Sequence, residues 1–525
     1  MKKYLFILCS LFLVSNLFGQ NQNISNAYVF DGEPYLSINP LNPQNMVVAW
    51  MGYVINNNIC IKTKTTFDAG HTWSTTHYIP HVNPAYGSAD PSLAFDNSGN
   101  VFLSYIDYDT GIDSGAVYVV KSSDGGLTWG SPVEVINAHS DTGKYPIDRP
   151  WISVDCSGGF NAGNIYITTM PPNVFGPLSP PYHPYFIVST DNGNTFNSWQ
   201  YLDTINWLSG NIIQQPMATN CVSPNGIFHA IYPSYMPSQS LYARYIIASS
   251  ADAGNSFTYH TVLNSTQGIS DTLAKKGYLL CSDHSDANHL VFVYLDIPYG
   301  DIDVFLKESF DGGVTWSNAV RVNDDPVANN RMQDLVWASF DNDGDLVVSW
   351  RDRRNGTDST YTTASEIWAA VRCKDSTNFS SNFRISDCTV PYDSILAYSG
   401  NDFMCIKLDN DTLNAVWGDT RTGKLNIWFQ RMDINGIILS RQQISSDNIP
   451  GIKIYPNPAK SNIIISGKQL VKVCIFNQSG KIVSVYQNLN EVKKLIVNLN
   501  HFSRGEYFVQ VTSSNSVITK KIIKQ

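Results

Sequence analysis

The sequence predicts an all-β protein: a seven-bladed β-propeller followed by a small β-sandwich. Three observations favour this fold class. Only 15% of the 525 residues are charged and 12% are aromatic, with 35 glycines and 25 prolines, which suits short strands joined by turns better than helical bundles or coiled coils. A pattern of about 60 residues recurs seven times. The end of the chain differs in charge from the rest, which marks a separate module.

The chain opens with a segment typical of an export signal. Two lysines precede an apolar run from Tyr4 to Gly19, which is too short and wrongly flanked for a membrane span. We therefore predict a signal peptide over residues 1–19. No later stretch approaches about 18 uninterrupted apolar residues, so we expect no membrane span. The eight later cysteines show no C-x-x-C spacing, which gives zinc or thioredoxin-like chemistry no support.

Each unit of the repeat opens with a polar residue, often before proline, and continues as a short apolar strand. A turn such as residues 96–100 follows, and then a second strand that ends near an aromatic residue. Units of this size cannot bury their apolar faces alone, so seven of them close most economically into a propeller over residues 26–447. The units open at Glu33, Asp90, Arg149, Gln215, Gly277, Gln333 and Asn401, at intervals of 56 to 68 residues.

Five units contain a sharp loop between their third and fourth strands. Residues 309–316 read S-F-D-G-G-V-T-W: the aspartate caps the turn, glycine takes positive φ, and tryptophan packs under the hairpin. The other four loops centre on Asp68, Asp124, Asp191 and Asp252. These loops resemble the Asp-box, or bacterial neuraminidase (BNR) repeat, S-x-D-x-G-x-T-W. The resemblance implies a sialidase-like propeller in which the Asp-box is structural; such sialidases have six blades, so six is the alternative to seven.

The sixth unit lacks this loop, and Cys373 and Cys388 flank its expected place. The third and fourth strands of a blade are antiparallel neighbours, so a disulfide between these two residues could replace the loop. Asp341, Asp343 and Asp345 have the spacing of a calcium loop, but the same kind of turn recurs at 96–100 with fewer acids. We therefore expect no metal and no cofactor.

The last module, residues 449–525, is basic, with ten lysines and one arginine against two glutamates, although the whole chain has a net charge of −9. Its alternating strands and turns predict the β-sandwich. The stretches 452–459 and 505–511 resemble the C-terminal sorting domain of the type IX secretion system of Bacteroidota. That resemblance implies the secretion machinery as a partner, loss of the tail, and release or attachment at the cell surface. A carbohydrate-binding sandwich is the alternative.

Strand direction predicts where a ligand would bind. The first strand of a blade starts, and the second ends, at one face of the propeller, whereas the Asp-box loops lie at the other face. Polar residues at the first face should surround the channel mouth. These candidates are Glu33, Asp90, Asp148, Arg149, Arg331, Asp334, Arg351, Arg353, Asp402 and Arg421. Acids and arginines together grip anionic or polyhydroxyl ligands, although polar side chains also line any solvent-filled channel.

We therefore expect a secreted or surface-attached sialidase-like propeller that engages extracellular glycans through its channel face. The acidic body argues against a nucleic-acid partner. The sialidase resemblance assigns no catalytic residues, because the early Arg-Ile-Pro motif is absent and Asp148-Arg149-Pro150 echoes it only partly, in a different unit. The alternatives are a glycoside hydrolase of exo-sialidase type or a lyase, and an adhesive or structural surface protein. Replacing Arg149 by Ala should weaken ligand binding and leave thermal stability nearly unchanged.

Overall fold

The computed structural model describes residues 21–439 and 453–525 apart from short gaps, and the described residues form strands and turns but no helix. The gaps are 28, 55–57, 110, 112–113, 173–177, 266–276, 361, 392–400, 468–469, 478–481, 488–492 and 514–515. The predicted signal peptide lies outside the described residues. None of the described residues belongs to a helix that could cross a membrane. The chain divides into two compact units, Met1–Ser440 and Arg441–Gln525, each described by itself below.

The described part of unit 1 contains seven four-stranded antiparallel sheets. The first sheet comprises β2 (Asp31–Asn39), β3 (Asn42–Tyr53), β4 (Ile59–Thr66) and β5 (His77–Tyr78), and the second comprises β6 (Gly87–Phe95), β7 (Val101–Tyr108), β8 (Gly115–Ser122) and β9 (Val133–Asn137). The third comprises β10 (Asp148–Val154), β11 (Ile165–Met170), β12 (Tyr185–Ser189) and β13 (Gln200–Tyr201).

The next three sheets repeat this order of strands. The fourth comprises β14 (Thr219–Val222), β15 (Phe228–Ser234), β16 (Arg244–Ser250) and β17 (Thr258–Asn264), and the fifth comprises β18 (Leu279–Ser282), β19 (Leu290–Asp296), β20 (Asp303–Ser309) and β21 (Val320–Arg321). The sixth comprises β22 (Gln333–Phe340), β23 (Leu346–Asp352), β24 (Glu366–Arg372) and β25 (Phe383–Arg384).

The seventh sheet combines both ends of unit 1. It contains β26 (Cys405–Asp409), β27 (Thr412–Asp419) and β28 (Asn426–Asp433), and its fourth strand is β1 (Gln22–Asn23). β1 pairs antiparallel with β28. The side-chain amide of Asn21 donates hydrogen bonds to Gln430 Oε1 at 2.6 Å and to the main-chain oxygen of Ile385, in the sixth sheet, at 3.2 Å. The start of the described chain therefore joins the last two sheets.

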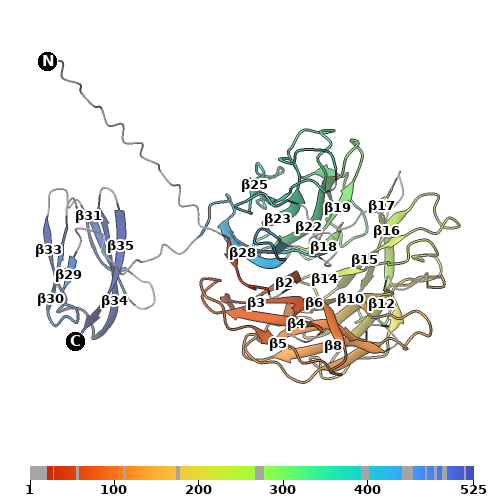
Figure 1. Ribbon diagram of the computed structural model, residues 1–525, viewed down its shortest axis with the longest axis horizontal. Helices are drawn as coiled ribbons and strands as arrows, with labels where there is room; N and C mark the ends of the chain where they lie inside the picture. The colour runs from red at the N-terminus through yellow and green to blue at the C-terminus, as the bar shows by residue number, and fades with distance from the viewer. Residues whose placement is uncertain are drawn as a thin grey trace, which may run out of the picture. The chain divides into compact units, whose positions relative to one another are not determined.

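The first strands of the sheets pack against one another in a closed ring. Each first strand contacts the next one along the chain, in the order β2, β6, β10, β14, β18, β22 and β26, and β26 contacts β2. Figure 1 accordingly shows β2, β6, β14 and β22 toward the middle of unit 1 and β5, β17 and β25 at its periphery. A ring of four-stranded sheets with the first strands innermost is the arrangement of a β-propeller.

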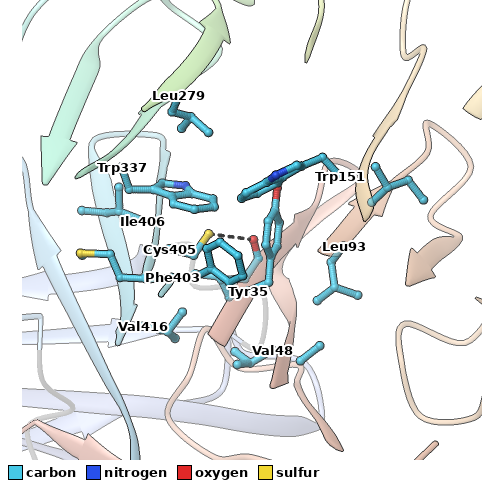
Figure 2. Packing of buried hydrophobic residues seen from close by; sticks show 14 of the residues in the cluster. Tyr35, Val48, Leu93, Trp151, Leu279, Trp337, Phe403, Cys405, Ile406 and Val416 are labelled. Atoms are coloured by element: carbon cyan, nitrogen blue, oxygen red, sulfur yellow. Dashed lines mark hydrogen bonds between the residues drawn. The ribbon is translucent and has the colours of Figure 1, made fainter. Parts of the chain in front are cut away.

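Four aromatic side chains fill the centre of the ring. Tyr35 from the first sheet, Trp151 from the third, Trp337 from the sixth and Phe403 before the seventh have neighbouring ring centroids 5.4–5.7 Å apart. Figure 2 shows these rings pointing toward one another, and none is more than 9% exposed. We call these four residues the aromatic plug, because they close the channel at this level.

The five loops that resemble the Asp-box, called Asp-box loops below, join the third and fourth strands of the first five sheets. After β20, Asp311 Oδ1 accepts a hydrogen bond from the main-chain nitrogen of Thr315 at 2.9 Å, and Oδ2 accepts one from Thr315 Oγ1 at 2.6 Å. The same two bonds recur in the other four loops. The glycine two residues after the aspartate has φ between 80° and 94°, a conformation that other residues rarely adopt.

Each of these loops packs against the preceding sheet. A Cβ added to Gly254 would lie 2.2 Å from the ring of Phe186 on β12, and one added to Gly70 would lie 2.4 Å from Phe429 on β28. Trp129 Nε1 likewise donates a hydrogen bond to Thr63 Oγ1 on β4 at 3.2 Å. The loops thus fasten five of the seven boundaries between sheets.

The sixth and seventh sheets lack the Asp-box sequence, and charged pairs join them to their predecessors. Arg372 Nη1 on β24 donates a hydrogen bond to Glu308 Oε2 on β20 at 2.8 Å, which links the sixth sheet to the fifth. Arg421, which follows β27, forms an ion pair with Asp387, which follows β25, and this pair links the seventh sheet to the sixth.

The predicted disulfide between Cys373 and Cys388 is not formed, because both residues are free cysteines. Cys373 directly follows the end of β24. Cys388 lies beyond β25, next to Val390, which pairs with Ser365 at the start of β24. The hairpin therefore carries the two thiols to opposite ends of β24. The number of residues between the two cysteines did not show that the chain runs back along the whole of β24 before it reaches Cys388.

Unit 2 contains two sheets that enclose one apolar core. One sheet comprises β29 (Lys453–Tyr455), β30 (Asn462–Ser466) and β33 (Lys494–Asn498), and the other comprises β32 (Ile482–Tyr486), β31 (Leu470–Phe476), β34 (Gly505–Ser513) and β35 (Ser516–Lys524). Ile463 and Val497 from the first sheet pack with Val473 and Val509 from the second. None of these core residues belongs to the cores of unit 1.

Candidate functional site

Three successive sheets carry a β-bulge in their first strand. The register against the neighbouring strand shifts at Glu33 in β2, at Asp90 in β6 and at Arg149 in β10. These residues have φ values of 55°, 54° and 48°, a left-handed conformation that costs a side-chain-bearing residue about 1–2 kcal/mol. Bulges re-aim side chains next to binding sites, and the recurrence of the strained position indicates that the bulges arrange these three polar side chains.

Glu33, Asp90 and Asp148 line one cavity with a volume of about 540 Å³. Tyr53, the last residue of β3, and Tyr108, the last residue of β7, belong to its wall. The remaining wall is apolar and consists of Val29, Phe30, Met51, Ile59, Ala89 and Ile106. The cavity therefore combines acids and phenols with an apolar lining, as small-molecule sites do.

Two acids of this cavity, Glu33 and Asp148, have a raised pKa. Burial raises the pKa of Glu33 well above its ordinary value of 4.5, and the neighbouring Asp90 and Asp402 raise it further. Burial also raises the pKa of Asp148 well above 3.8, and Asp90 adds to that effect. Gln215 Nε2 donates a hydrogen bond to Asp148 Oδ2 at 3.1 Å. A buried acid with a raised pKa can donate a proton to a ligand.

Arg149 brings positive charge to this group of acids. Its Nη2 donates a hydrogen bond to Asp402 Oδ2 at 3.0 Å, and its main-chain nitrogen donates one to Asp90 Oδ2 at 3.4 Å. The guanidinium carbon lies 5.2 Å from the ring centroid of Phe403, on the aromatic plug. Although burial lowers the pKa of Arg149, Asp402 and Asp148 raise it more. We call Glu33, Asp90, Asp148, Arg149 and Asp402 the acidic cluster.

The structure thus brings together five of the ten predicted site residues. Three others form a separate buried group, in which Arg351 Nε and Arg353 Nη1 donate hydrogen bonds to Asp334 Oδ1 at 2.8 Å and 3.1 Å. Asp334 and Arg351 face each other across the pairing of β22 with β23. The bulge of β22 places Leu335, with φ 54°, at the position of Glu33, so the sequence alignment of Gln333 with Glu33 was wrong by two residues.

The last two predicted residues also have partners outside the acidic cluster. Arg421 Nε donates hydrogen bonds to both carboxylate oxygens of Asp419 at 3.0 Å. The main-chain nitrogen of Arg331 donates a hydrogen bond to Asp301 Oδ2 at 3.0 Å, and its Nη1 donates one to the main-chain oxygen of Asn330 at 3.3 Å. Acidic partners therefore offset the charge of Arg421, as they do for Arg351 and Arg353, whereas the guanidinium of Arg331 binds a main-chain oxygen.

Sequence reasoning missed the two tyrosines of the cavity wall. Tyr53 and Tyr108 hold the same position in the first and second sheets, at the end of the second strand. That position lies on the face predicted for the site, so the repeat itself contained the signal. Tyr105 obscured this signal, because it lies earlier in β7 and matches the aromatic residue expected at the end of the strand. Tyr105 is fully buried and contributes to packing.

Comparison with known proteins identifies the end of the chain. Residues 453–525 match the family model of the secretion system C-terminal sorting domain. The protein therefore carries the signal for type IX secretion, to the cell surface or beyond it. A comparison with curated proteins returns no match.

Solved structures similar to the chain differ from it widely in sequence. A protein of unknown function from Dyadobacter fermentans is 14% identical, with a TM-score of 0.41 over 67% of this chain and 99% of its own. The alpha-L-arabinanase of Penicillium chrysogenum, complexed with arabinobiose, is 12% identical, with a TM-score of 0.43 over 80% and 99%. The NanB sialidase of Streptococcus pneumoniae is 11% identical, with a TM-score of 0.40 over 80% and 71%. At this level of similarity, none of them assigns an activity to this chain.

Proposed function

We propose that the exported chain binds an uncharged extracellular glycan in the cavity of the acidic cluster. We also propose that unit 1 is a seven-bladed β-propeller, in which each four-stranded sheet is one blade, and that a small β-sandwich follows it. One observation carries the proposal of glycan binding: Glu33, Asp90 and Asp148 meet Tyr53 and Tyr108 in a single cavity of about 540 Å³. Carboxyl and phenol groups hydrogen-bond sugar hydroxyls, and aromatic rings provide apolar contact area.

The charge of the site supports an uncharged ligand over an anionic one. The acidic cluster contains four carboxyl groups and one guanidinium, and Arg149 already binds Asp402. A carboxylated or sulfated sugar would therefore meet repulsion from like charges. The sialidase resemblance implies three arginines on the substrate carboxylate, but Arg351 and Arg353 bind Asp334. An uncharged glycan fits these contacts, whereas a sialic acid does not.

Glycan binding by the full chain tests the proposal. A glycan array followed by calorimetric titration should show binding of uncharged oligosaccharides and none of their sialylated or sulfated counterparts. Tyr108→Ala and Asp90→Asn should each weaken binding about tenfold or more, because the first removes the phenol and the second replaces a charged hydrogen-bond acceptor by a neutral amide. Asp286→Asn, an exposed change in the turn between β18 and β19, should leave the affinity unchanged. Preference for sialylated glycans would overturn the proposal.

Glycoside hydrolysis is a second candidate function, favoured by the raised pKa of Asp148. A general acid in glycoside cleavage must keep its proton at working pH, and burial achieves this. Incubation of the full chain with the bound oligosaccharide should then release reducing ends, and Asp148→Asn should abolish the release while preserving measurable binding. Binding without release of reducing ends would mean that the protein recognises the glycan but does not cleave it. The absence of any glycan binding would favour an adhesive protein.

A further inference from the structure

A second group of carboxylates lies in the turn between β22 and β23, outside the acidic cluster. One oxygen atom from each of Asp341, Asp343 and Asp345 lies within 4.8 Å of the other two. The side chain of Asp343 is exposed, whereas Asp341 and Asp345 are only 3% and 7% exposed. Two of these three acids are therefore held away from water.

The equivalent turn of the second sheet provides an internal reference. There, Asp96 Oδ1 accepts hydrogen bonds from the main-chain nitrogens of Ser98 and Asn100, both at 2.8 Å. Asp96 Oδ2 accepts a third bond from the side-chain amide of Asn100 at 2.7 Å. Both carboxylate oxygens of Asp96 are thus satisfied by donors from the same turn.

The turn at 341–345 has the same backbone bonds but lacks that amide. Asp341 Oδ1 accepts hydrogen bonds from the main-chain nitrogens of Asp343 at 3.2 Å and Asp345 at 3.0 Å. Asp345 occupies the position of Asn100, and its carboxylate cannot donate a hydrogen bond. Asp341 Oδ2 is consequently buried without a hydrogen-bond partner. A buried carboxylate oxygen without a partner is costly, and a bound cation would remove that cost.

We infer that the turn at 341–345 binds a calcium ion, with Asp341 Oδ2 and the carboxylates of Asp343 and Asp345 as its protein ligands. Calcium takes oxygen ligands at about 2.3–2.6 Å, so oxygens on opposite sides of the ion are about 4.6–5.2 Å apart. The three ligand atoms lie within 4.8 Å of one another, close enough for one calcium ion to contact all three. The exposed position of Asp343 leaves the remaining coordination positions to water.

The nearest lysine does not bind the carboxylates of this turn through its ammonium group. The main-chain nitrogen of Lys374 donates a hydrogen bond to Asp345 Oδ1 at 2.7 Å, but its ammonium is directed to Ser285 Oγ at 2.8 Å, in the fifth sheet. A bound cation would offset the like charges of the three neighbouring carboxylates.

Calorimetric titration of the full chain with CaCl2, together with thermal denaturation in CaCl2 and in EDTA, tests the inference. We expect one equivalent of calcium with a dissociation constant of about 10⁻⁴–10⁻³ M, as for sites in extracellular modules, and a rise in Tm of about 1–2 °C. Asp345→Asn recreates the amide of Asn100, so it should lose the calcium response and be at least as stable in EDTA as the unchanged chain.

The matched control is Asp411→Asn. This change removes the same charge from the turn between β26 and β27, at an exposed residue outside the cluster, so the calcium response should persist. A full response in Asp345→Asn, or an equal loss in Asp411→Asn, would overturn the assignment. The absence of heat and of a Tm shift up to about 10 mM CaCl2 would do the same, and an equal response to MgCl2 would overturn the choice of calcium.

Discussion

Glu33 shows how burial and neighbouring charges determine the behaviour of one side chain. It is 3% exposed, its Oε2 has no hydrogen-bond partner in the described structure, and burial, Asp90 and Asp402 raise its pKa. Folding therefore favours the protonated form of Glu33. Its contribution to stability is present below its unfolded pKa and is lost as the pH rises toward the folded pKa.

Glu33→Gln should therefore stabilise the protein at pH 7, because the amide needs no proton and carries no charge. We expect a rise in Tm of about 1 °C at pH 7 and no difference below the ordinary pKa of 4.5, where the acid is neutral too. Scanning calorimetry at the two pH values measures this. Glu134→Gln, on an exposed residue, is the control, and an equal shift at both pH values would contradict the prediction.

Arg149→Ala should reduce stability, in contrast to the expectation from sequence. Arg149 binds Asp402 and lies among three further acids, so the variant removes a positive charge from a group of four carboxyl groups. We expect the free energy of unfolding at pH 7 to fall by about 1–3 kcal/mol, with Arg149→Lys losing less. Urea denaturation measures this loss, which should shrink at pH 4, where Glu33 and Asp148 are protonated because their pKa is raised. An unchanged value at pH 7 would show that solvent screens the cluster.

Among the elements, the Asp-box loop after β20 links stability to pH. Hydrogen bonds from Thr315 lower the pKa of Asp311 to about 2, so the ionised form is stabilised by folding. This stability is present above the ordinary pKa of 3.8 and is lost as the pH falls through 2. Asp311→Ala should lower the free energy of unfolding by about 1 kcal/mol at pH 7.

Urea denaturation at pH 7 and pH 3 checks this prediction. The difference between Asp311→Ala and the unchanged chain should be smaller at pH 3, because Asp311 of the unfolded chain, with its ordinary pKa of 3.8, binds a proton there. Asp286→Asn removes a charge from an exposed turn without the Thr contacts and serves as the control. A difference that does not depend on pH would mean that packing, rather than the ionised carboxylate, holds the loop.

Elements were predictable where a local pattern determines them. The Asp-box sequence contains its own capping aspartate, glycine and aromatic residue, and all five loops form the expected bonds to the aspartate. The openings at Glu33, Asp90 and Arg149 likewise predicted the residues that meet in the acidic cluster. In these cases the information lies within about ten residues of the element, where turn chemistry acts.

Elements were not predictable where the partner is distant in sequence. β1 consists of Gln22 and Asn23, which show no apolar pattern, and it is held by β28 about 400 residues later. The pairing of Asp334 with Arg351 depends on the register between β22 and β23, which a bulge shifts. Cross-strand register is set by the whole sheet, so the neutralised arginines could not be recognised from spacing.

For the whole molecule, ring closure depends on the first described residues. Asn21 donates hydrogen bonds to Gln430 and Ile385, and β1 completes the seventh sheet. Deleting residues 21–25 should therefore lower the Tm of unit 1 by about 2–4 °C. Deleting residues 453–525 is the control: it should leave that transition in place, because unit 2 has its own core. Equal effects of the two deletions in calorimetry would contradict this account.

The unequal fastening of the sheets gives the ring a preferred breaking point. An Asp-box loop adds apolar packing to each boundary that it covers, whereas the boundaries on either side of the sixth sheet have the ion pairs of Glu308 with Arg372 and of Asp387 with Arg421 instead. Salt screens such partly exposed pairs but does not weaken apolar packing. Amide hydrogen exchange should therefore accelerate with ionic strength in β22 to β25 and not in β6 to β9. Under strain, we expect the ring to open first beside the sixth sheet, at one of its two boundaries.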